Sequence, residues 1–334
     1  MQQVVLLGAA HSIAFKMARG VEQSRSLKLF GVYDENAALR NEAAQRLGVP
    51  AIAEIDTALA CTPAIALVGS VPAQRADLAQ RALESGAAAI VDNPLALTHD
   101  ALDQLIAAAD KYDRPVVTYQ PGRGDPMVLA AWDAYQAGRI GDLVRVFVNG
   151  PHKIRPAKRS HWHWTRTGNG GILIDIGGHS FDFCCWFAGA EPDTITAFHA
   201  NHNWPQHPEF QDFAQATIRF TNGVLANVEQ DWLAVDAMQS FGDARLWLQG
   251  TKGKIELYMG DQTLAKIWTH QTAGEDLDLS PYPGVDAWTV KLIEDLAAGH
   301  DGDIRQHQVW RPTRAALLAL DSAQQGGAPV AWRP

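Results

Sequence analysis

The sequence predicts an α/β protein in two parts: an N-terminal α/β domain with a parallel sheet, and a C-terminal α+β domain with a mostly antiparallel, open sheet. Two observations lead to this fold class. Up to residue 120, apolar strands alternate with segments of helix length, the pattern of βαβ units. After the break PGRGDP at 121–126, a helix and then a run of alternating strands follow, which favours an antiparallel sheet with helices on one face. We therefore expect domains at 1–121 and 122–334.

Each expected strand of the first domain is a short apolar run, and each expected helix carries its apolar residues on one face. We expect strands at 3–8, 27–34, 64–70, 88–94 and 115–120. We expect helices at 11–24, 36–48, 73–86 and 99–112. Gly48 and Gly86 close two of these helices, as glycine commonly does at a helix C-terminus.

The second domain mixes helices with hairpins. TNG and TKG are hairpin signals inside the alternating stretches 214–232 and 244–259. Further strands are expected at 143–150, 194–200 and 263–269, and helices at 127–138, 171–189, 286–299 and 314–326. In the stretch ARLWLQG, Leu246 and Leu248 alternate with Trp247, so both faces of this strand carry apolar bulk. An exposed apolar patch of this kind usually marks an interface.

Composition narrows the functional classes. The chain has 334 residues, 47% of them apolar, and a net charge of −9 from 28 basic and 37 acidic residues. This balance predicts neither nucleic acid nor an anionic membrane as a partner. Cys61, Cys184 and Cys185 do not form a disulfide framework, and no run approaches the ~20 apolar residues of a membrane span. We expect a cytoplasmic protein.

The first strand–turn–helix, VVLLGAAHSIAF, partly matches a dinucleotide-binding fingerprint. Gly8, Ala10 and Ile13 stand where G-x-G-x-x-G would place its glycines. Ala10 puts a methyl group where the backbone approaches a pyrophosphate, and Ile13 requires looser helix packing. His11 and Ser12 can still donate hydrogen bonds to a phosphate at the helix N-terminus. The alternative is a strand–helix turn that binds no nucleotide.

Asp34 ends the second strand, 26 positions after Gly8. An acidic residue near this position of a Rossmann domain accepts a hydrogen bond from a ribose 2′-hydroxyl and repels a 2′-phosphate. Asp34 therefore predicts NAD rather than NADP as cofactor. The alternative is an acidic helix cap.

The strongest pattern lies in GNGGILIDIGGHSFDFCCWFAG. Asp175, His179, Asp182 and Trp186 are spaced by 4, 3 and 4 residues, so they are expected to form one stripe on a helix. A carboxylate beside an imidazole orients the ring and favours its protonated form, which suits general acid–base catalysis. The alternative is a structural hydrogen-bond network.

The stretch HKIRPAKRSHWHWTRTG, residues 152–168, is the densest basic segment, and its His163 and Trp164 stand among polar residues, which suggests that they face a ligand. His161, His163, Asp175 and His179 are residue types that ligate metals. Their spacing fits no recognised zinc pattern, so we expect no metal.

Asp92, Asn93 and Pro94 follow an apolar strand, at the edge where open α/β sheets bind ligands. A lysine at position 93 would suggest chemistry, and the asparagine raises the question of what replaces its charge.

The whole chain resembles the glucose–fructose oxidoreductase, inositol dehydrogenase and rhizopine-catabolism (Gfo/Idh/MocA) family. The long motif of that family, G-G-G-x-L-x-D-x-G-x-H-x-x-D-x-x-x-W-x-x-G, is matched by Gly168, Gly170, Gly171, Leu173, Asp175, Gly177, His179, Asp182, Trp186 and Gly189. Its Glu-Lys-Pro-Leu-Ala, Thr-Pro-x-x-His and Arg-x-x-Pro motifs correspond to DNPLA at 92–96, SVPAQR at 70–75 and RGDP at 123–126.

The resemblance implies a Rossmann domain, an NAD(P)-dependent oxidoreductase acting on a sugar, polyol or related hydroxy compound, and a homodimer or homotetramer. His179 would be the acid–base residue, Asp175 would bind or orient the substrate, and Asn93 would occupy the place of a catalytic lysine. The implied cofactor-binding residues are Gly8, Ala10, His11, Ser12, Ile13, Asp34, Ser70, Pro72, Arg75, Asp92 and Pro94. The expected substrate-binding residues are Arg123, His163, Trp164 and Arg166.

Asn93 can donate a hydrogen bond but carries no charge and cannot relay a proton. Either the substrate needs no ammonium group there, or another cation replaces it, or ordinary dehydrogenation has been abandoned. The candidate cations are Arg123, Lys153, Lys158 and Arg166. Two other functions stay open: a non-redox enzyme that uses tightly bound NAD for elimination or hydrolysis, and a non-catalytic nucleotide- or sugar-binding protein.

Overall fold

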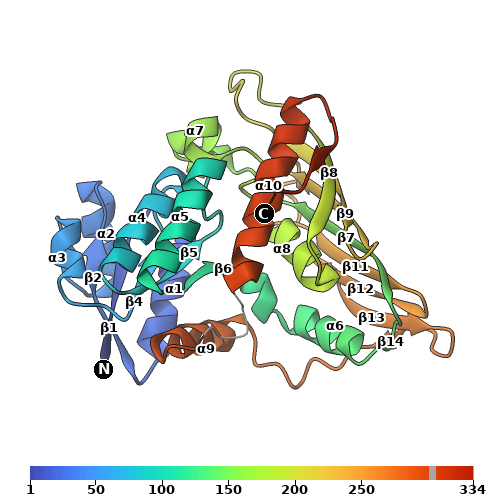
Figure 1. Cartoon of the computed structure of the whole chain (residues 1–334), viewed down its shortest axis with the longest axis horizontal. Helices are drawn as coiled ribbons and strands as arrows, with labels where there is room; N and C mark the ends of the chain where they lie inside the picture. Colours follow the sequence, from blue (N-terminus) through green and yellow to red (C-terminus); the bar gives the residue numbers. More distant parts are fainter. Residues whose placement is uncertain (301–305, 334) are drawn as a thin grey trace. The chain divides into compact units, whose positions relative to one another are not determined.

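The computed structural model describes residues 1–300 and 306–333 (Figure 1). The chain forms two compact units: unit 1 comprises Met1–Pro121 with Gly284–Trp310, and unit 2 comprises Gly122–Pro283 with Arg311–Pro334. Unit 1 thus includes residues 284–310, which lie beyond the boundary expected from the sequence. Among the described residues, no helix is both long and apolar enough to cross a membrane.

Unit 1 is built on a six-stranded parallel sheet with the strand order β3-β2-β1-β4-β5-β6. The strands are β1 (Gln2–Leu7), β2 (Leu27–Tyr33), β3 (Ala51–Ile52), β4 (Ile65–Val68), β5 (Ala88–Asp92) and β6 (Val116–Tyr119). All residues of β4 are fully buried, because the helices between parallel strands cover both faces of the sheet. The expected parallel α/β domain is confirmed.

The helices of unit 1 are α1 (Ser12–Gln23), α2 (Ala37–Leu47), α3 (Ile55–Leu59), α4 (Pro72–Glu84), α5 (His99–Tyr112) and α9 (Val285–Ala297). The sequence did not predict the short β3 and α3. Helix α9 joins unit 1 because Leu292, Ile293 and Leu296 are buried in its core, and Ser24 Oγ donates a 2.6 Å hydrogen bond to Glu294 Oε1. The label α9 therefore lies beside α1 in Figure 1.

Unit 2 is built on a nine-stranded sheet with the order β14-β13-β12-β11-β7-β10-β9-β8-β15. Its strands are β7 (Leu143–Pro151), β8 (Pro192–Ala200), β9 (Phe213–Phe220), β10 (Leu225–Asp231), β11 (Ala244–Gly250), β12 (Gly253–Met259), β13 (Thr263–Thr269), β14 (Glu275–Asp276) and β15 (Val330–Ala331). The pairing of β10 with β7 is parallel, and the pairs on either side are antiparallel. The expected mostly antiparallel sheet and its two hairpins are confirmed.

Helices α8 (Gly177–Ala188) and α10 (Gln306–Gln324) lie over one face of this sheet (Figure 1). The remaining helical segments are α6 (Pro126–Gln136), α7 (Arg166–Asn169) and the 3-10 turns η1 (Pro121–Gly124), η2 (Pro156–Lys158) and η3 (His161–Trp164). Helix α8 is shorter than expected. Residues 172–176 form turns after Gly170 and Gly171, whose φ angles of 81° and 88° interrupt a right-handed helix. Asp175 therefore precedes the helix, and its expected place on the helical stripe was wrong.

Candidate active site

The turn between β1 and α1 forms the first part of a nucleotide site in unit 1. Gly8 has φ +84°, and a Cβ atom there would lie 2.3 Å from Ser70 Cβ, so only glycine fits. Ala10 and Ile13 are half-buried, and Ser12 is exposed at the first position of α1. The first N–H groups of a helix have no partner within it and point outward, so this turn presents donors suited to a phosphate.

Asp34 lies at the carboxyl end of β2 and is buried. Its Oδ2 accepts a 2.8 Å hydrogen bond from Ala9 N, and its Oδ1 accepts one of 2.9 Å from Asn36 N. Asp34 also lines a pocket with Gly8, Tyr33, Glu35, Ser70 and Gln74. Burial, followed by the charges of Glu35, Asp34 and Glu54, raises the pKa of Tyr33. Asp34, Glu35 and Asp77 thus line this pocket, and their charges disfavour a further phosphate, while Arg40 Nη1 donates a 2.9 Å hydrogen bond to Asp34 O.

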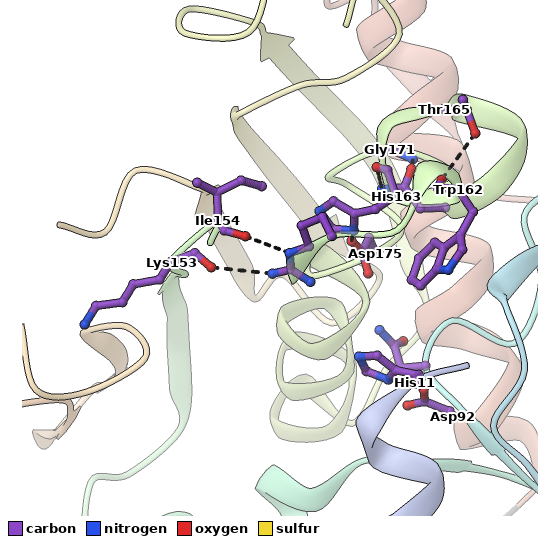
Figure 2. Close-up of polar contacts among 12 residues, drawn as sticks. His11, Asp92, Lys153, Ile154, Trp162, His163, Thr165, Gly171 and Asp175 are labelled. Atoms are coloured by element: carbon purple, nitrogen blue, oxygen red, sulfur yellow. Dashed lines mark hydrogen bonds and ion pairs between the residues drawn. The ribbon is translucent and has the colours of Figure 1, made fainter. Parts of the chain in front are cut away.

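Asp92, at the end of β5, contacts two basic side chains. Its Oδ2 accepts a 2.7 Å hydrogen bond from Arg75 Nη2 and lies 2.6 Å from His11 Nδ1, and Figure 2 shows His11 beside Asp92. Arg75 also donates to the carbonyl oxygens of Ser70, at 3.0 Å, and of Asn93. Arg75 and Asp92 are 1% and 2% exposed, whereas the His11 side chain is 34% exposed. The three residues were expected separately at the cofactor site, but their contacts with one another could not be predicted from the sequence, because they come from α4, β5 and the turn before α1.

Asn93 is buried and is followed by a cis peptide bond to Pro94. Pro72 is the first residue of α4 and is buried. The predicted cofactor-binding residues of unit 1 thus lie on the β1–α1 turn, at the ends of β2 and β5, and in the stretch from Ser70 into α4. This is the carboxyl edge of the sheet, where open α/β folds bind ligands.

His179 and Asp175 form the centre of a second candidate site, in unit 2. His179 is half-buried in the first turn of α8, and Asp175 lies in the turn that leads into this helix. The Asp175 side chain is 18% exposed, and its Oδ2 is 3.9 Å from His163 Nδ1. Figure 2 shows His163 and Asp175 next to each other. The structure thus brings two of the predicted site residues, His163 and Asp175, close together.

Aromatic rings surround His163, which is only 1% exposed. Its ring centroid is 5.1 Å from that of Trp232, 5.8 Å from Phe210 and 5.7 Å from Trp164. Trp164 stacks on His207 at 4.2 Å. An imidazole in such apolar surroundings is a packed core residue as well as a neighbour of Asp175. Direct contact of His163 and Trp164 with substrate stays a prediction.

Three of the four candidate cations have partners in the fold. Arg123 Nε and Nη2 each donate a 2.7 Å hydrogen bond to a different carboxylate oxygen of Asp182. Lys153 Nζ donates to the carbonyl oxygens of Asp236 and Met238. Arg166 Nη1 donates to Gly170 O at 3.2 Å, and burial, partly offset by Glu209, lowers its pKa. Lys158 is exposed.

Arg159, which the sequence did not single out, also lies in this region. Its Nε donates a 2.7 Å hydrogen bond to Ile154 O, and its guanidinium lies 4.6 Å from the ring centroid of Trp232. Burial lowers the pKa of Arg159, the charge of Asp175 raises it and that of Arg155 lowers it. A basic residue within a loop gives no signal in sequence that it is near a site. In residues 1–300 and 306–333, no group of His, Cys, Asp and Glu could hold a metal.

Two family models match the chain. The model described as "Oxidoreductase family, NAD-binding Rossmann fold" matches residues 2–120. The model described as "GFO/IDH/MocA C-terminal domain" matches residues 128–256. Together they cover most of the chain.

Individual curated proteins and solved structures of oxidoreductases are also similar to this chain. The inositol 2-dehydrogenase of Rhizobium meliloti is 26% identical over 204 residues, which are 58% of this chain and 56% of that protein. The chain spans 56 to 63% of the lengths of the curated relatives that it matches. An oxidoreductase structure from Erwinia carotovora is 25% identical with a TM-score of 0.89, covering 97% of this chain and 99% of the other. An Agrobacterium radiobacter oxidoreductase in complex with NAD+, L-tartaric acid and magnesium is 15% identical with a TM-score of 0.85, covering 99% and 98%.

The buried Arg123–Asp182 pair makes a prediction about stability. Arg123→Met leaves the Asp182 carboxylate buried without its counter-ion, which destabilises a protein by about 3–5 kcal/mol. We expect a clearly lower urea midpoint, measured by tryptophan fluorescence. Arg139→Met is the matched control, because Arg139 pairs with Glu275 at the surface and such pairs contribute only about 0–1 kcal/mol. Equal midpoints for the two variants would contradict a structural role for the buried pair.

Proposed function

Because the chain belongs to the Gfo/Idh/MocA oxidoreductase family, we propose that it is an NAD-dependent dehydrogenase that acts on a sugar, polyol or related hydroxy compound. The observation that carries the proposal is the carboxyl edge of the parallel sheet in unit 1, with Gly8 and Asp34 at the strand ends. The proposal assigns the cofactor to these residues of unit 1 and the substrate to the half-buried His179 and Asp175 of unit 2.

The residues of unit 1 fit a dinucleotide. Gly8 provides the tight turn, and the N-terminus of α1 offers N–H donors to the diphosphate. Asp34 stands where a ribose hydroxyl is held, although both of its carboxylate oxygens also accept backbone hydrogen bonds. The methyl group of Ala10 weakens the close approach of a diphosphate without preventing it. When bound, the nicotinamide accepts or supplies the hydride.

His179 is the proposed acid–base residue, because an imidazole can take a proton from a substrate hydroxyl near neutral pH and return it in the reverse reaction. Asp175 is proposed to bind or orient the substrate through its carboxylate. Asn93 is proposed to donate a hydrogen bond to the reacting oxygen in the place of a lysine. Losing a charged donor there lowers transition-state stabilisation by ~1–3 kcal/mol, roughly ten- to a hundredfold in rate.

We place the protein in the cytoplasm. Cys61, Cys184 and Cys185 are free thiols, as expected in a reducing compartment. Burial raises the pKa of Cys185 to about 12, so this thiol stays protonated and unreactive.

The first prediction concerns the cofactor. The protein should bind NAD(H) with a Kd in the micromolar range or weaker, and more tightly than NADP(H), because carboxylates surround the ribose pocket. Asp34→Asn should narrow this preference, whereas Asp110→Asn, at an exposed position of α5, should leave it unchanged. Isothermal titration calorimetry of the three proteins with each nucleotide measures all six affinities. If neither nucleotide binds, the dehydrogenase proposal fails.

The second prediction concerns catalysis. His179→Ala should lower NAD reduction on a polyol panel by at least ~100-fold, the scale of general acid–base catalysis. The control His202→Ala, at an exposed position, should retain full activity. Unchanged turnover in His179→Ala would show that the acid–base residue lies elsewhere.

A third prediction concerns Asn93. Asn93→Lys should raise dehydrogenase activity on generic polyols or create it, because an ammonium group stabilises a developing alkoxide. If Asn93→Lys instead destroys an existing activity, asparagine is the working residue for a different substrate. NAD that stays bound through purification without net turnover would favour the non-redox enzyme, and ligand binding without conversion would favour the binding protein.

We further propose that the protein forms a homodimer or homotetramer through the helix-free face of the unit 2 sheet. On this face Trp247 stacks on Phe147 at 4.8 Å, and Phe198 and Leu225 are exposed.

Light scattering at micromolar concentration should therefore give a multiple of 36.4 kDa, and Trp247→Glu should shift the mass to that of a monomer while NAD affinity is retained. A monomeric mass for the unmodified protein would contradict the proposed assembly.

A further inference from the structure

The charges of unit 2 near Asp175 are unbalanced. Residues 152–166 contain five cationic side chains and no carboxylate: Lys153, Arg155, Lys158, Arg159 and Arg166. The rest of the chain is acidic, with a net charge of −9 overall. A local excess of one sign within a protein of the opposite sign attracts ligands of matching charge to that place.

Arg159 is a half-buried member of this group that uses few of its hydrogen-bond donors. Its Nε donates to Ile154 O at 2.7 Å and its Nη2 to Lys153 O at 3.4 Å. Within residues 1–300 and 306–333, it forms no ion pair with a carboxylate, and its Nη1 makes no hydrogen bond. An arginine has five N–H donors, so most of those on Arg159 stay unused although the side chain is half-buried.

The guanidinium is also fixed in orientation and set against another cation. It lies 4.6 Å from the ring centroid of Trp232, which restricts a planar group to a narrow range of positions. Burial lowers the pKa of Arg159, the charge of Asp175 raises it and that of Arg155 lowers it. An anion bound to the unused N–H groups would offset the burial of the guanidinium and its repulsion by Arg155.

Arg159 is close to the proposed chemistry. Asp175 is the carboxylate whose charge acts most on it, and Asp175 is 3.9 Å from His163. The Arg159 guanidinium lies 4.6 Å from the ring centroid of Trp232, and the Trp232 ring lies 5.1 Å from that of His163. An anion on Arg159 would therefore belong to the molecule that Asp175 orients.

We infer that Arg159 binds a carboxylate group of the substrate, so that the preferred substrates are sugar acids, such as hexonic or hexuronic acids, rather than neutral sugars or polyols. The planar fork of a guanidinium matches the two oxygens of a carboxylate. The inference rests on the proposed function, because it names the class of substrate for that same site.

The test compares NAD reduction with hexonic and hexuronic acids against the neutral hexitols and hexoses of the same stereochemistry, with hexose phosphates as a third class. We expect kcat/KM for the best acid to exceed that of its neutral counterpart by about 10- to 100-fold, the worth of a charge-assisted hydrogen bond. Added salt should reduce kcat/KM for the acids more than for the neutral sugars.

Variants identify the residue. Arg159→Met should remove most of the preference for acids while changing kcat/KM for neutral substrates by less than about 3-fold, the margin of a surface change. Arg159→Lys should retain part of the preference for acids, because a lysine keeps the positive charge but lacks the planar pair of N–H donors of a guanidinium. Arg139→Met is the matched control and should keep the full preference. NAD affinity, which depends on unit 1, reports whether each variant is folded.

Several outcomes would overturn the inference: neutral substrates that match or exceed the acids, an equal loss for both classes in Arg159→Met, or a dependence on Arg159 confined to hexose phosphates. These results would leave the dehydrogenase proposal intact. If no compound supports NAD reduction, isothermal titration calorimetry tests the anion site separately. A hexonate is titrated into the unmodified protein and into Arg159→Met. Binding that depends on Arg159 would support the anion site and reject dehydrogenation, and absence of binding would reject the anion site.

Discussion

The buried carboxylate of Asp92 is the constraint on which the nucleotide side of this protein depends. It is 2% exposed and is held by Arg75 and His11, so that one side chain joins α4, the end of β5 and the turn before α1. A buried charge is tolerated only when it is paired and hydrogen-bonded. These three segments must therefore keep their relative positions, and the backbone of Asn93, which accepts a hydrogen bond from Arg75, is fixed with them.

Unit 2 is also stabilised by a buried, hydrogen-bonded ion pair. Asp182 on α8 accepts two hydrogen bonds from Arg123 in η1, and the guanidinium also lies 4.9 Å from the ring of Trp186. His179 is one turn before Asp182 on the same helix, so the pair fixes the helix that carries the proposed acid–base residue. In each unit a fully paired, buried ion pair supports the backbone, while the residues proposed to meet ligands, such as His11 and Asp175, stay partly exposed.

The sequence predicted what depends on periodicity. Apolar runs such as those of β4 and β5, and the alternation in β11, require only neighbours along the chain, so both sheets could be inferred. Features that depend on contacts between separate segments of the chain could not be predicted. Helix spacing placed Asp175 on a helical stripe, but two glycines with positive φ delay the start of α8. Arg75, Arg123 and Arg159 bind partners that are 17, 59 and 5 residues away in the sequence. Helix α9 packs on α1, although most of the chain separates the two helices in the sequence.

The two units also differ in the charge that they present to a ligand. The pocket of unit 1 beside Gly8 is lined by Asp34, Glu35 and Asp77. In unit 2, residues 152–166 carry cations and no carboxylate, and Asp175 follows them before α8. Electrostatic complementarity contributes more to specificity than to affinity. Under the proposed function, an extra phosphate on the ribose would be disfavoured at the first site, and under the proposed role of Arg159 a substrate carboxylate would be favoured at the second. The net charge of −9 does not predict the charge preference of either site, because that preference depends on the positions of a few side chains.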